Sequence, residues 1–121
     1  MSVTISISSE PDDIWMIRNT VYRWLVERVR EYHPDESDVI ERLTVCGYLG
    51  GVSLDTECSA SPDLGSRIVG VLLDTADAII EKRVPLTEGT GQPGPELEAK
   101  VHESLRDLVA LLRRFQNKTS P

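Results

Sequence analysis

The sequence has few of the residues that most metal, redox and cofactor sites require. It contains only two cysteines, Cys46 and Cys58, twelve residues apart and in no Cys-x-x-Cys pair. This spacing predicts neither a zinc site nor a disulfide framework. The two histidines, His33 and His102, have no second ligand at the spacing of a zinc site. We therefore expect reduced thiols, no bound metal and no cofactor.

Phosphate-binding and catalytic motifs are also missing. The glycine-rich stretch 47–51 is not followed by the Lys-Ser/Thr of a phosphate-binding loop, and no strand-glycine-helix fingerprint for a dinucleotide occurs. These absences exclude the common nucleotide folds. No pattern supports a Cys-His nucleophile pair. The sequence thus offers no catalytic residue, and we expect a protein that is not an enzyme.

Long hydrophobic runs are absent too. Apolar stretches such as Ile68–Leu73 are far shorter than the roughly 18 residues that cross a membrane. The N-terminus lacks the basic flank and apolar segment of a secretory signal. We expect a cytoplasmic protein without membrane insertion.

Basic residues are in short supply. Lysine and arginine total 13 against 20 aspartates and glutamates, which gives a formal net charge of −7. Nucleic-acid binders take much of their affinity from basic side chains that displace counterions at phosphates. The charge balance therefore excludes a nucleic-acid partner and favours a basic protein partner.

What is present is the composition and periodicity of one helical domain. A chain of 121 residues with 40% apolar residues can bury a single core. We predict a mainly α fold, a small antiparallel bundle of about four helices. The predicted segments of this single domain (1–121) are an edge strand or extended arm at 1–10, helices at 12–32, 35–49, 62–83 and 95–115, a glycine-rich loop at 84–94 and a polar tail at 116–121.

The N-terminal assignments follow from apolar spacing. Val3, Ile5 and Ile7 alternate with serine and threonine, as in a short strand. From Asp12 the spacing becomes helical, with apolar residues at Ile14, Ile17, Val21, Leu25, Val29 and Tyr32. A single short strand needs a partner strand, which we place near Val52–Leu54. We extend the second predicted helix as far as Leu49, so it ends before this strand.

Two arginines, Arg18 and Arg28, fall inside the apolar arc of the predicted first helix. Arginine is seldom buried without a partner. We expect each to reach an acid on a neighbouring helix or to extend past the core edge, and a contact to an anion or a partner is the alternative.

The densest acidic stretch comprises Asp35, Glu36 and Asp38, with Glu41 one turn later. One interpretation is a solvated, well-capped helix start, because acids favour the positive end of the helix dipole. The other is a docking patch for a cationic protein, and these four residues are then the partner-binding residues.

An enzymatic alternative rests on acid pairs one helical turn apart. Asp38 with Glu41 and Asp74 with Asp77 have this spacing. It resembles, in outline, the Mg²⁺ sites of all-helical nucleoside triphosphate pyrophosphatases. A structural subunit that pairs with its own copies is the third possibility.

Of these readings we prefer a binding protein. Bacterial immunity proteins and antitoxins are small, cytoplasmic and often acidic, and they neutralise basic nuclease toxins by charge-complementary docking. The chain is similar to them in size, charge and helix content, and this similarity implies a basic toxin domain as partner.

Overall fold

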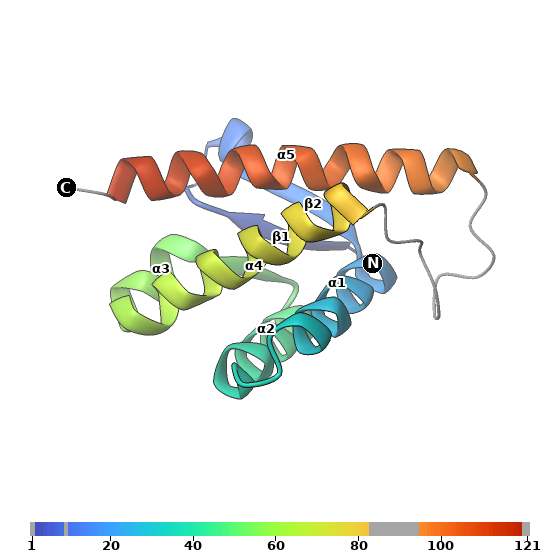
Figure 1. Cartoon of the computed structure of the whole chain (residues 1–121). Helices are drawn as coiled ribbons and strands as arrows, with labels where there is room; N and C mark the ends of the chain where they lie inside the picture. The colour runs from blue at the N-terminus through green and yellow to red at the C-terminus, as the bar shows by residue number, and fades with distance from the viewer. Residues whose placement is uncertain (1, 9, 83–94, 120–121) are drawn as a thin grey trace.

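The computed structural model describes residues 2–8, 10–82 and 95–119. Within them the chain is mainly helical and carries a small sheet (Figure 1). The elements, in chain order, are β1 (Ser2–Ser6), the short 3-10 helix η1 (Pro11–Asp13), β2 (Ile14–Arg18), α1 (Asn19–Tyr32), α2 (Ser37–Leu49), β3 (Gly51–Ser53), α3 (Leu54–Ala60), α4 (Pro62–Lys82) and α5 (Pro95–Thr119). No helix in the described ranges is both long and apolar enough to cross a lipid bilayer.

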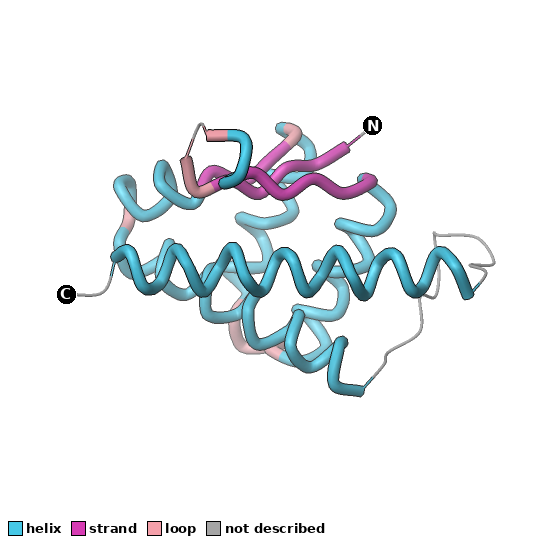
Figure 2. Tube along the Cα trace, turned by 90° about the horizontal axis from the view of Figure 1, so that it is seen from above, coloured by secondary structure: helices cyan, strands magenta, loops and turns pink. Residues whose placement is uncertain are grey.

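The three strands form one sheet in the order β2-β1-β3, with β1 antiparallel to β2 and parallel to β3. Ile5 of β1 lies between Trp15 and Val52 in the register. These three side chains are buried and face the helices. The neighbouring positions Ile14 and Met16 point to the other face and are exposed. Figure 2 shows the strands gathered at one side of the molecule, with most of the helical mass on the other.

Two glycines connect α2 to β3. Gly50 has φ +95°, the left-handed conformation that commonly ends a helix, and its N–H caps the carbonyls of Cys46 and Gly47. Gly51 then lies so close to Thr4 that a Cβ would approach the Thr4 carbonyl oxygen to 2.9 Å. Here β3 can pair with β1 only because residue 51 has no side chain.

The core lies between the inner sheet face and the helices. α4 and α5 pack against each other, and α5 also contacts β2. The indole N–H of Trp15 donates a 2.7 Å hydrogen bond to the carbonyl of Ser104, which ties β2 to α5 across 89 residues of sequence. The largest fully buried side chains come from nearly every element, including Ile5, Tyr22, Leu25, Leu43, Leu54, Leu72, Ile79, Leu105 and Leu112.

The predicted first helix is wrong over its first seven residues. Residues 12–18 form η1 and β2, and the helix begins at Asn19. Ile14 and Ile17 have helical spacing relative to Val21, but Trp15 and Ile17 instead point inward from a strand that pairs with β1. The hydrogen bonds and buried face gained by pairing with β1 outweigh the local helical pattern.

The other segments need smaller corrections. The helix predicted at 35–49 begins at Ser37, and the strand near Val52 is confirmed as the mate of β1. The seven-residue helix α3 was not predicted. The predicted tail is wrong at 116–119, where α5 continues. The predicted loop 84–94, and Arg83 at the end of the third predicted helix, lie outside the described residues.

The two arginines of the predicted apolar arc have different surroundings. Arg18 is an exposed residue at the end of β2, so it does not lie on the apolar face of a helix. Arg28 is half-buried, pairs with Glu31 of its own helix at 3.1 Å and lies 5.9 Å from the ring centre of Trp24. Its partner is thus on the same helix and not on a neighbouring one.

Candidate functional site: an acidic edge at the start of α2

The four acids singled out from the sequence lie around the start of α2. Asp35 and Glu36 are in the turn that follows α1, Asp38 is in the first turn of α2, and Glu41 is one turn further on. Asp35, Asp38 and Glu41 are exposed and Glu36 is half-buried. They occupy one end of the α1–α2 pair, at the bottom of Figure 1.

Arg67 of α4 organises this cluster. Its Nη1 and Nη2 donate to the two carboxylate oxygens of Asp38 at 2.8 and 2.6 Å. Its Nε and Nη2 donate to Glu36 at 3.1 and 2.7 Å. A weaker contact of 3.5 Å joins Nη1 to Asp63, one turn earlier on α4. A single guanidinium therefore joins carboxylates from the α1–α2 turn, α2 and α4.

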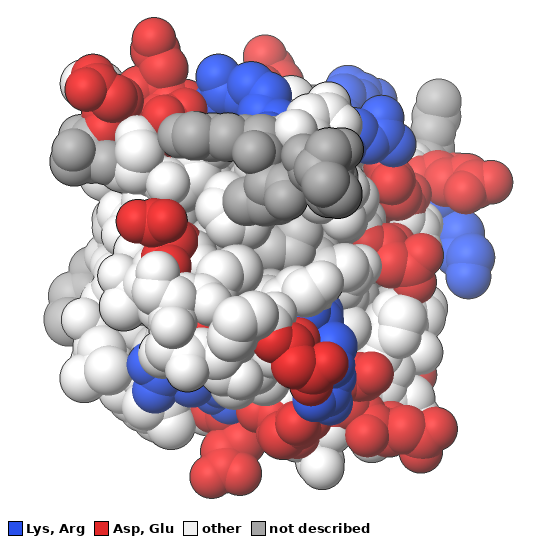
Figure 3. All heavy atoms as spheres, turned by 90° about the vertical axis from the view of Figure 1, so that its left-hand side faces the viewer, with Lys and Arg blue, Asp and Glu red and all other residues white. Residues whose placement is uncertain are grey.

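We call Asp35, Glu36, Asp38, Glu41 and Asp63 the acidic edge. Glu36, Asp38 and Asp63 contact Arg67, and the five acids together with this one arginine carry a formal net charge of −4. In the space-filling view of Figure 3, acidic side chains outnumber basic ones along the lower rim, and the middle of that face is largely uncharged. Much of the chain's net negative charge is therefore local.

The hydrogen bonds of Arg67 change the protonation equilibria of this cluster. They lower the pKa of the Asp38 carboxyl, and the Coulombic attraction of the same guanidinium acts in the same direction. The same hydrogen bonds, which Arg67 donates to Asp38 and Glu36, raise the pKa of Arg67. Asp38 and Arg67 therefore keep their charges at any pH near neutrality.

Replacing Arg67 by glutamine should remove a pH-dependent stabilisation. Because the pKa of Asp38 is lower in the folded state than its ordinary value of 3.8, the stabilisation is present above about pH 4 and lost as the pH falls further. The stability difference between wild type and Arg67→Gln should thus be largest near pH 7 and shrink below about pH 4.

Urea unfolding at a series of pH values measures this difference. Arg113→Gln is the matched control, since Arg113 makes one exposed contact, to Asp77 at 3.3 Å. An Arg67→Gln deficit that stays constant from pH 7 to pH 3 would contradict the role given to Arg67.

The acid pairs of the hydrolase alternative do not converge. Asp38 is held by Arg67, Asp74 contacts His33 at 2.8 Å, and Asp77 contacts Arg113. Among the side chains that the structure describes, no group of three or more His, Cys, Asp or Glu is placed to hold a metal ion. No observation in these segments favours the hydrolase.

A second polar cluster is buried between α2 and α3. Glu57 is 6% exposed, and its Oε1 accepts hydrogen bonds from Nε and Nη2 of Arg42 at 2.8 and 2.7 Å. The thiol of Cys46 donates to the same oxygen at 3.5 Å. Burial raises the pKa of the Cys46 thiol to about 11, so this cysteine is a poor nucleophile at neutral pH. We interpret the cluster as structural.

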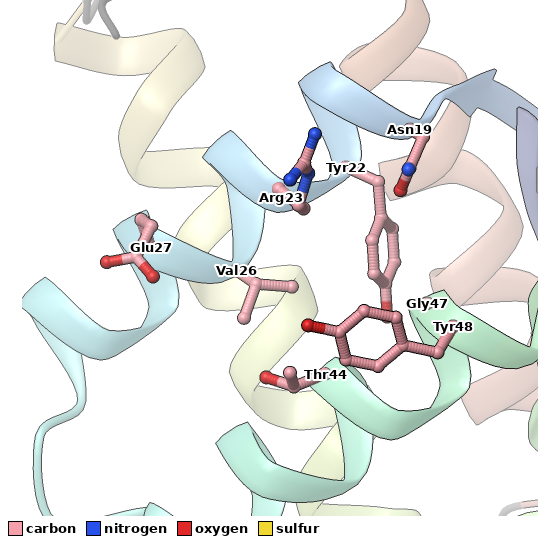
Figure 4. A pocket seen from close by; sticks show the side chains of 8 residues that line it. All are labelled: Asn19, Tyr22, Arg23, Val26, Glu27, Thr44, Gly47 and Tyr48. Atoms are coloured by element: carbon pink, nitrogen blue, oxygen red, sulfur yellow. The ribbon is translucent and has the colours of Figure 1, made fainter. Parts of the chain in front are cut away.

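The solvent side of the α1–α2 pair is hollowed. One hollow of about 200 Å³ lies between Asn19, Tyr22, Arg23, Val26 and Glu27 of α1 and Thr44, Gly47 and Tyr48 of α2 (Figure 4). A more open hollow continues along the same helices, lined by Arg30, Pro34, Ser37, Ile40, Glu41, Thr44 and Val45. We call the two together the α1–α2 groove. Glu41 belongs both to the groove and to the acidic edge.

Sequence reasoning found four of the five carboxylates of the acidic edge and missed Asp63 and Arg67. Asp63 lies within the helix predicted at 62–83 and is in the first turn of α4. Its proximity to α2 depends on how α4 crosses that helix. The one available signal was the spacing of Asp63 and Arg67, four residues apart on one helix face.

These features describe a mainly helical domain on a small sheet, with one acidic edge and one groove. The chain matches no protein-family model, no curated protein and no solved structure. Inference about its function therefore rests on the side chains themselves.

Proposed function

We propose that this chain is a protein-binding domain of the immunity-protein or antitoxin type, which neutralises a basic, nuclease-type bacterial toxin by direct binding. The observation that carries the proposal is the acidic edge, a cluster of five carboxylates of which three contact the guanidinium of Arg67. A nuclease surface that binds phosphates is rich in lysine and arginine. The acidic edge presents negative charge to such a surface, as the phosphates of a nucleic acid do.

Arg67 supports this role because it fixes two of the acids in place. Glu36 and Asp38 are each held by two hydrogen bonds. Side chains that are already ordered lose less conformational entropy on binding, so less affinity is lost. The exposed acids Asp35 and Glu41 would steer the approach of the partner.

The apolar part of such an interface would lie beside the acidic edge. Val45 and Ile40 line the hollow that Glu41 and Ser37 also line. Protein interfaces commonly combine apolar anchors, which give most of the affinity, with a charged rim that selects the partner. In this role the protein would act in the cytoplasm, where a nuclease toxin meets its target.

The test measures association of the purified chain with a panel of basic nuclease toxin domains, together with inhibition of their nuclease activity. For a true partner, the association rate should fall about tenfold between roughly 0.05 and 0.3 M salt. The double variant Asp35→Asn/Asp63→Asn should lower that rate further. A search for a toxin gene directly upstream would narrow the panel.

The matched control is Glu103→Gln/Asp107→Asn, which removes the same charge from exposed positions of α5. If the two double variants slow association equally, only net charge matters and the acidic edge is not the contact. Absence of binding and inhibition across the panel would overturn the proposed function.

A further inference from the structure

Exposed apolar side chains cluster on the second half of α2. Among the described residues, the large hydrophobic side chains that remain exposed are Ile14, Met16, Val45, Tyr48 and Leu49, and the last three belong to α2. Tyr48 is 85% exposed and Leu49 is 74% exposed. Such clusters on a folded surface mark contact sites, and tyrosine is enriched at protein interfaces.

The α1–α2 groove carries opposite charges at its two ends. Arg23 lines the first hollow and Glu41 lines the second, and neither has an ion-pair partner among the described residues. Glu27 of the first hollow and Arg30 of the second neutralise each other at 2.8 Å. Arg18, in a further hollow that shares Asn19 with the first, adds to the positive end.

Thr44 lies at the middle of this arrangement, because it lines both hollows. Arg23 of the first hollow and Arg30 of the second are seven residues apart on α1, so the two hollows are offset by about 10 Å along the helix axis. Figure 4 shows Tyr48 and Thr44 of α2 facing the side chains of α1 across the first hollow.

We infer that the α1–α2 groove is the interface of a symmetric homodimer, with a twofold axis near Thr44. A twofold axis brings the same surface of both copies together in antiparallel order. Arg23 of each copy then lies opposite Glu41 of the partner subunit, and Val45 and Tyr48 pack in between. A uniformly basic or acidic segment would meet like charge at one end, whereas a second copy meets opposite charge at both ends.

This inference is argued without the proposed function, but the two surfaces share Ile40, Glu41 and Val45, so a docked toxin and a second copy would compete for the second hollow. The toxin-binding test changes Asp35 and Asp63, and neither lines the groove. The dimer test changes Arg23, Glu41 and Tyr48. A negative result in the toxin-binding test therefore does not contradict the homodimer, and a monomeric protein does not contradict toxin binding.

Sedimentation equilibrium of the wild-type chain over a wide concentration range is the first measurement, and a concentration-dependent dimer is expected. Arg23→Glu and Glu41→Arg should each raise the dimer dissociation constant about tenfold or more, because each creates two like-charge contacts. Tyr48→Ser should also weaken the dimer. Arg106→Glu, at an exposed position of α5, is the control and should leave it unchanged.

The decisive sample is an equimolar mixture of Arg23→Glu and Glu41→Arg. In a mixed dimer one contact is the native pair and the other is the reversed pair, so the mixture should dimerise although neither variant does alone. A wild-type monomer at all concentrations, or a mixture that stays monomeric, would overturn the inference. So would a dimer that Arg23→Glu leaves intact.

Discussion

Replacing Gly65 by alanine should destabilise the protein by about 1–3 kcal/mol, the range of overpacked cores. Gly65 is a buried residue near the start of α4, where α4 meets α3. A Cβ added there would lie 2.5 Å from Sγ, 2.7 Å from Cα and 2.8 Å from N of Cys58. Two of these atoms are backbone, so the clash is relieved only if the helices move apart.

Gly70→Ala provides the matched control in the same helix. A Cβ at Gly70 meets nothing within 4 Å. Alanine is preferred over glycine in helices, so this variant should be stabilised by about 0.5–1 kcal/mol. Urea denaturation of the three proteins measures both effects. If both substitutions shift stability in the same direction, the close α3–α4 contact does not exist.

Replacing Arg42 by methionine should cost about 3 kcal/mol, as expected when one partner of a buried ion pair is removed. The Glu57 side chain is 8% exposed, and its carboxylate would lose both of its guanidinium hydrogen bonds. Among the described residues, the weak thiol donor of Cys46 at 3.5 Å would be its remaining partner. Methionine keeps most of the stem volume of arginine, so the loss is mainly electrostatic.

The reverse substitution should be milder. Glu57→Gln leaves Arg42, whose side chain is 40% exposed and can reach water, so the expected cost is about 1 kcal/mol. The double variant Arg42→Met/Glu57→Gln should be more stable than Arg42→Met alone, and a double-mutant cycle measures this coupling. Equal costs for the two single variants would show that burial of the carboxylate is not the dominant effect.

The N-terminal third shows that a local apolar pattern can fail to decide between a helix and a strand. The alternation of Val3, Ile5 and Ile7 correctly indicated a strand with one buried face, but β1 is the central strand of the sheet and not the predicted edge strand. Ile14 and Ile17, however, satisfy both a helical spacing with Val21 and a strand that points Trp15 and Ile17 inward. The β1–β2 pairing decided between the two, and pairing is a property of two segments together.

The same limit applies to the functional surface. The acids around the start of α2 form a dense acidic stretch in the sequence, and the predicted helix bounds placed them at the N-terminus of that helix. Arg67 follows Asp38 by 29 residues, and no periodicity links the two. The groove also arises only when α1 and α2 lie antiparallel, which brings Arg23 beside Thr44 and Tyr48.

The sequence by itself determined the mainly helical character, the bounds of α2 and α4 to within about two residues, the local excess of acid and the lack of a metal-site spacing. All of these depend on composition or on neighbours within one or two turns. The tertiary structure alone decided that 14–18 is a strand, that Arg67 gathers three carboxylates, and that Glu57 is buried against Arg42. Each of these is a contact between distant segments, whose energy exists only once the chain has packed.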